Sequence, residues 1–160
     1  MGEMSDREIR SPQPRCPQGF AAGTVVLASL YGEVTVPACL IAGLAVHHVV
    51  VSNGRCGPDH SWCLTRDWAV AHAATGLAFG YTRGSKRDAV KCAWALAACG
   101  VAWTRLKRGD DPGSVVGWTK AKAARARRAL QACGASPRGA AQAVSKSAIR
   151  NIRKQAGKRK

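Results

Sequence analysis

Three side chains able to bind a metal ion lie close together in the sequence. Cys56, His60 and Cys63 fall in one stretch that also contains a glycine and a proline and therefore reads as a loop. Thiolate and imidazole groups are the usual zinc ligands. A fourth ligand could come from another histidine: His47, His48 or His72. The spacing is not that of a common CxxC pair, so a loop histidine beside two unrelated cysteines is the alternative. Zinc is the one cofactor that the sequence suggests.

Residues for other reactions are scarce. Between residues 19 and 104 the only carboxylates are Glu33, Asp59, Asp67 and Asp88, which argues against metal-dependent nuclease or glycosidase chemistry. His72 lies near a turn, where a histidine is usually hydrogen-bonded locally rather than used as a base. We therefore expect a protein that is not an enzyme. The seven cysteines are an odd number without regular spacing, and the polar N-terminus does not resemble a secretory signal. Both observations favour reduced thiols and a cytoplasmic or nucleoid-associated protein.

Positive charge is concentrated in the last third of the chain. Residues 1–104 contain 9 Lys and Arg against 7 Asp and Glu, whereas residues 105–160 contain 16 against 2. No carboxylate follows Asp111, so ion pairs between neighbouring helical turns cannot explain the charges. The distribution predicts three parts: a disordered leader over 1–18, a near-neutral body over 19–104 and a basic arm over 105–160.

Two helices are expected in this arm. Asp111 and Pro112 resemble a helix start, as do Ser136 and Pro137, which predicts helices over about 111–133 and 136–155 with a turn at Gly134. Their candidate phosphate-binding residues, together with the basic tail, are Lys120, Arg125, Arg127, Arg128, Lys146, Arg150, Arg153, Lys154, Lys158, Arg159 and Lys160. Four of these, from Lys146 to Lys154, share one face at helical spacing.

A polyanion is the partner that such a surface predicts, since like charges repel when no polyanion is bound. Nucleic acid, either DNA or RNA, is favoured over a membrane, because the apolar helix faces are mostly alanine. The leading expectation is a nucleic-acid-binding protein. The alternative is a protein-interaction module, an inhibitor or assembly subunit, whose arm binds an acidic protein surface. A merely solvated basic surface is the third interpretation.

The body is expected to be α+β: a small antiparallel sheet with a packed helix, followed by the basic C-terminal helical hairpin. Apolar alternation over 62–73 and a short returning strand over 77–81 predict a β-hairpin. Ser85 and Asp88 resemble a capping box, and Gly100 a helix stop, which predicts a helix over 86–99. Its polar strip is narrow, so we expect most of this helix, Trp94 included, to be buried. Among the five tryptophans, Trp62 is the best candidate for exposure because it lies beside the loop.

Overall fold

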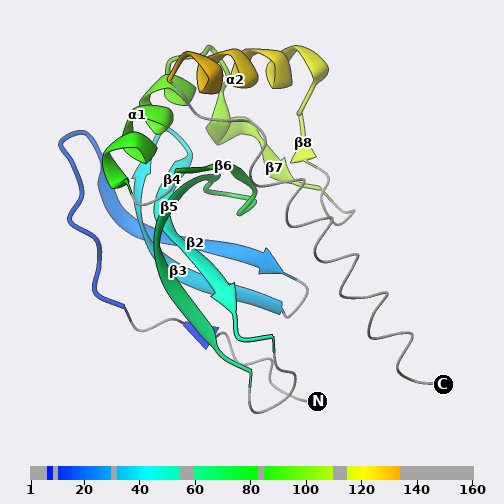
Figure 1. Cartoon of the computed structure of the whole chain (residues 1–160). Coiled ribbons are helices and arrows are strands. Elements are labelled where there is room, and N and C mark those ends of the chain that lie inside the picture. Colours follow the sequence, from blue (N-terminus) through cyan, green and yellow to red (C-terminus); the bar gives the residue numbers. More distant parts are fainter. Residues whose placement is uncertain are drawn as a thin grey trace.

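The computed structural model describes residues 7–8, 11–29, 32–54, 60–82, 85–109 and 115–133. Its main feature is one curled sheet, shown in Figure 1. The strands of this sheet are β1 (Arg7–Glu8), β2 (Ala21–Ser29), β3 (Gly32–Ile41), β4 (Leu44–Ser52), β5 (Trp62–His72) and β6 (Ala78–Thr82). Strands β2 to β6 pair antiparallel in chain order, and β1 pairs parallel with β3.

The apolar residues 38–46 form a hairpin between β3 and β4. Ala42 and Gly43 form its two-residue turn and both have positive φ, 48° and 82°. Two positive φ values are typical of the turn whose twist matches that of paired strands. The hairpin predicted over 62–81 is confirmed, since Val70 of β5 lies opposite Gly80 of β6.

The sheet curls far enough for its two ends to meet. The turn between β5 and β6 reaches β2, where a Cβ on Gly76 would lie 2.0 Å from the carbonyl oxygen of Val26. A bulge between His48 and Val50 adds to the twist of the sheet, because bulges increase local twist. Since the curled sheet has a core on each face, residues of β3 are buried on both: Val34 and Val36 on one face and Cys39 on the other.

Two helices complete the described fold. Helix α1 (Lys86–Ala97) begins as predicted, since the Ser85 hydroxyl accepts a hydrogen bond from the Asp88 N–H at 3.2 Å. It packs on β4 and β5. Helix α2 (Lys120–Ala132) packs against α1 (Figure 1). No helix in the described ranges is long and apolar enough to cross a membrane.

The predicted start of the second helix is wrong. Val115–Val116 form strand β8, which pairs antiparallel with β7 (Lys107–Arg108), and the helix starts only after Thr119. The Thr119 hydroxyl accepts from the Lys122 N–H, so a threonine supplies the cap. The local Asp-Pro signal did not reveal this strand pairing, which joins Arg108 to Val115 and Lys107 to Val116, 7 and 9 positions apart. The third predicted helix lies outside the described residues.

After α1, Trp103 begins a short 3-10 turn, η2 (Trp103–Arg105). One other segment differs from expectation. Part of the expected disordered leader contacts the sheet: β1 pairs with β3, and the Gln13 amide donates to the Ala38 carbonyl at 2.8 Å. The α+β class with an antiparallel sheet is thus what the structure has.

Candidate nucleic-acid interface

The basic surface is built on a helix with one narrow apolar side. Ala126 and Leu130 are the buried residues of α2, and both join the core formed by α1 and the sheet. They are four residues apart, so one stripe of the helix faces inward. Ala129 is partly buried against the same core, whereas Arg125, Arg127 and Arg128 are exposed.

The four α2 residues predicted to bind phosphate are all exposed: Lys120, Arg125, Arg127 and Arg128. Lys122 is half-buried, and its ammonium donates to the Gly117 carbonyl at 2.6 Å. The helix thus carries five cations over 13 residues and no carboxylate. The other predicted residues (Lys146, Arg150, Arg153, Lys154, Lys158, Arg159 and Lys160) lie outside the described part of the chain.

These cations have few partners in the described structure. The Arg125 guanidinium donates to the Gly100 carbonyl, just beyond the C-terminus of α1, at 3.3 Å. Within the described ranges, the side chains of Lys120, Arg127 and Arg128 make no hydrogen bond or ion pair. Lys120 and Lys122 also occupy the first turn of α2, where the helix dipole disfavours a positive charge by about 0.3–1 kcal/mol. The arrangement lowers the stability of the isolated helix and leaves three cations available for an anion.

A shallow groove separates the two helices on this side. It is lined by Ala95, Cys99, Arg125, Arg128, Ala129 and Ala132. Its floor is made of small side chains, and the two guanidinium groups come from the same helix. A chain of anionic groups could therefore approach α1 and α2 together.

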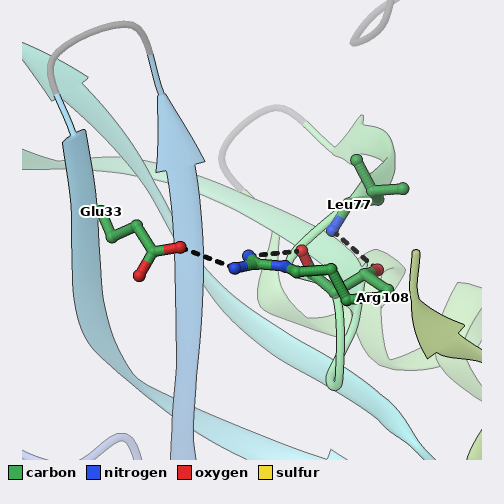
Figure 2. A network of polar contacts seen from close by, with 4 residues as sticks. Glu33, Leu77 and Arg108 are labelled. Carbon is green, nitrogen blue, oxygen red and sulfur yellow. Dashed lines mark hydrogen bonds and ion pairs between the residues drawn. The ribbon is translucent and has the colours of Figure 1, made fainter. Parts of the chain in front are cut away.

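Arg108 belongs to a different arrangement. Figure 2 shows its guanidinium between the Glu33 carboxylate on β3, at 2.6 Å, and the turn after β5, where it donates to the Thr75 carbonyl at 3.4 Å. Both charged side chains are about half exposed, at 48% and 47%. An ion pair of this kind contributes about 0–1 kcal/mol. Arg108 thus holds the segment leading to α2 on the sheet.

A buried hydrogen-bond network fixes the same segment more firmly. The His72 Nε2–H donates to the Trp103 carbonyl at 2.7 Å, which leaves Nδ1 to accept from the Thr75 hydroxyl at 2.9 Å. The Trp103 indole N–H in turn donates to the Leu96 carbonyl of α1 at 2.7 Å. His72 is 2% exposed. It therefore links β5 to η2; its contact with Thr75 is the local one that was expected, whereas the contact with Trp103 joins residues 31 positions apart.

Sulfur atoms join α1 and α2. The Cys92 and Cys133 Sγ atoms are 2.8 Å apart, and the Cys133 thiol also lies 3.2 Å from the Leu130 carbonyl. Burial raises the pKa of the Cys92 thiol, and its hydrogen bond with Cys133 raises it further. The Cys92 thiol is therefore protonated at neutral pH, and the two cysteine side chains pack the end of α2 onto α1.

The predicted zinc loop is only partly described. Cys56 lies outside the described residues. The His60 Nε2 is 3.0 Å from the Ser52 hydroxyl, and Cys63 is exposed on β5 opposite Val51. The Ser52–His60 contact joins the two ends of the loop. In the described ranges, no three His, Cys, Asp or Glu side chains are grouped to hold a metal ion. Zinc binding by Cys56, His60 and Cys63 stays a prediction.

The other histidines named as possible ligands lie in the sheet. His47 is 3% exposed, and its Nδ1 contacts the His48 carbonyl at 2.7 Å. Burial lowers the pKa of His47 below its ordinary value. The His48 ring stacks on Trp68 with the ring centroids 3.8 Å apart. His47 is therefore a neutral core residue at pH 7.

Tryptophan exposure differs from the sequence prediction. Trp62 is half-buried and packs against the core cluster that contains Val34 and Val36, whereas Trp94 is 48% exposed and Trp118 37% exposed. Trp94 was expected to be buried, but the buried face of α1 is centred on Ala89, Cys92, Ala93 and Leu96. Its spacing from Arg87 and Lys91, at i+7 and i+3, is the sequence signal that could have placed it on the outward face.

Comparison with protein-family models, with curated proteins and with solved structures gives no match. The chain's own residues therefore carry the functional inference.

Proposed function

We propose that this protein is a non-enzymatic nucleic-acid-binding protein that holds phosphates through the outward face of α2 and the basic residues that follow it. The observation that carries this proposal is the charge of α2: five cations in 13 residues with no carboxylate. Lys and Arg that neutralise phosphates release condensed counterions, which supplies most of the affinity of sequence-independent binding.

The composition of α2 supports binding to the phosphates of a nucleic acid rather than to a lipid surface. Three of the five cations are arginines, whose planar guanidinium groups match phosphate oxygens in pairs. A membrane-surface helix needs large apolar side chains to insert. The one leucine of α2, Leu130, is 7% exposed and packs into the protein core.

The test is the salt dependence of binding. A labelled 20-base-pair duplex and a labelled RNA of equal length are titrated with the full chain at several salt concentrations, with fluorescence anisotropy as the readout. We expect log Kobs to fall linearly with log salt concentration. Replacing Lys120, Arg127 and Arg128 with glutamine should reduce the slope on duplex DNA by about 2.7, because each neutralised phosphate contributes about 0.9. Glutamine keeps a high helix propensity, so α2 should remain folded.

Arg66→Gln is the matched control for the single variant Arg128→Gln. Arg66 is exposed on β5, away from α2, and its loss changes the net charge by the same amount. We expect Arg128→Gln to lower the slope by about 0.9 and Arg66→Gln to leave it unchanged. Binding without salt dependence, or equal effects of the two variants, would contradict the proposal.

A second candidate is a protein-interaction module, favoured by apolar side chains at the surface near the start of α2. Val116 is 59% exposed and Trp118 37% exposed, and exposed apolar groups are more typical of protein contacts than of phosphate contacts. This function would predict no affinity for either nucleic acid. It also predicts a stoichiometric protein partner in native mass spectra of the protein isolated from its source.

A further inference from the structure

The outward face of α1 carries an aromatic ring between positive charges. Arg87, Lys91 and Trp94 are spaced at i, i+4 and i+7, and all three are exposed. They therefore form one stripe, on the side of the helix opposite the buried residues. Trp94 leaves 48% of its surface in solvent, although burying so large an apolar side chain would be favourable.

The exposed indole is held in place along one side. The Phe20 ring meets it edge-on, with centroids 5.6 Å apart and an interplanar angle of 90°. Gly19, with a φ of 86°, lies against the far end of the indole, where a Cβ would be 3.1 Å from its Cζ2 and Cη2 atoms. Phe20 is itself positioned by a turn, since its N–H donates to the Pro17 carbonyl at 3.1 Å. The ring is thus positioned before any partner binds.

Positive charge continues from this stripe onto α2. Ala95, next to Trp94, lines the groove whose other wall carries Arg125 and Arg128. The two helices together present four cations around the groove and the indole. The one carboxylate of α1, Asp88, lies in its first turn. The surface is complementary to a chain of negative charges that also carries flat rings.

We propose that this face binds a single-stranded segment of nucleic acid, with a base stacked on Trp94 and phosphates on the cations of α1 and α2. This inference rests on the proposed function and names its substrate. Stacking needs an uncovered base face, and in a duplex both faces of each base are covered by neighbouring pairs. Base–aromatic stacking within a basic groove is how proteins bind single strands without reading sequence.

The experiment compares a labelled 15-nucleotide oligothymidine with a 15-base-pair duplex, by fluorescence anisotropy at one salt concentration. Trp94→Ala should weaken binding of the single strand about 5- to 150-fold, the range for loss of one stacked base. It should change duplex binding less than about 2-fold, because phosphate contacts dominate there. Trp94→Phe should retain most of the single-strand affinity, since phenylalanine keeps a stacking face and the contact with Phe20. Thermal melts of both variants establish that they are folded.

The charge variants separate stacking from phosphate binding. Replacing Arg87 and Lys91 with glutamine should lower the salt slope for the single strand by about 1.4, at about 0.7 for each phosphate. Trp94→Ala should leave that slope unchanged. Unaltered single-strand affinity of folded Trp94→Ala, or equal losses on both nucleic acids, would overturn the stacking inference while leaving the proposed function standing. Failure of the unmodified protein to bind either nucleic acid would overturn both. Loss of a protein partner in Trp94→Ala, without loss of single-strand binding, would assign the indole to a protein contact instead.

Discussion

Replacing His72 with leucine removes both hydrogen bonds of a residue that is 2% exposed. The Trp103 carbonyl loses the donor at 2.7 Å but keeps the longer bond from the Leu106 N–H at 3.2 Å. The Thr75 hydroxyl, 4% exposed, loses the acceptor of its proton and keeps only the hydrogen bond that it accepts from the Leu77 N–H at 3.4 Å. One lost hydrogen bond contributes about 1 kcal/mol, and a buried hydroxyl proton without an acceptor costs about 1–3 kcal/mol.

We therefore expect His72→Leu to lower the free energy of unfolding by about 2–4 kcal/mol. At this chain length, 1 kcal/mol corresponds to about 2–4 °C in Tm, so the melting temperature should fall by about 5–15 °C. Urea denaturation followed by far-UV circular dichroism gives the first quantity, and a thermal melt gives the second.

Thr75→Val is the control because valine has nearly the shape of threonine but no hydroxyl. In the double variant the hydroxyl no longer exists to be left unsatisfied. The two changes should therefore destabilise together by about 0.5–1.5 kcal/mol less than the sum of their separate effects. A His72→Leu variant within about 0.5 kcal/mol of the unmodified protein, or strict additivity with Thr75→Val, would refute this account of the network.

Three further predictions concern the fold that holds the two helices. Leu96→Ala should destabilise by about 2–5 kcal/mol in urea denaturation, since Leu96 is fully buried between α1 and the sheet; a loss below about 1 kcal/mol would mean that this core is loosely packed. Gly76→Ala should lower the free energy of unfolding by about 3 kcal/mol or more, because the φ of Gly76 is 70° and the Val26 carbonyl leaves no room for a Cβ. A Gly76→Ala variant with an unchanged Tm would contradict the close approach of the turn to β2. Burial lowers the pKa of His47, so below about pH 6.5 the unfolded chain binds a proton that the folded chain does not. Stability should then fall with decreasing pH, by at most about 1.4 kcal/mol per pH unit from this residue, and His47→Leu should remove that part of the slope in urea midpoints measured from pH 7 to 5.

Local signals predicted much of the described fold. The hairpin of β5 and β6, the Ser85 cap of α1 and the end of α2 at Cys133 all depend on residues within a few positions of one another. Capping and strand alternation are short-range interactions, so the sequence contains their cause directly. The same holds for the cations of α2, because a helix with one apolar stripe and no carboxylates must present its charges to solvent.

The start of α2 could not be predicted without the tertiary structure. The same is true of the surroundings of the aromatic and histidine side chains. Helix α2 begins at Lys120 because Val115–Val116 pair with β7. Trp94 is exposed because four smaller residues of α1 face the sheet, and it is positioned by Phe20, which is 74 positions earlier in the chain.

Charge and local structure are thus properties that this sequence determines by itself, since like charges without acidic neighbours must face solvent or an anion. The packing of α1 on α2 decides that Ala95 of α1 lines one groove together with Arg125 and Arg128 of α2. That packing depends on contacts between distant residues, such as Cys92 with Cys133, and no short segment of the chain encodes it.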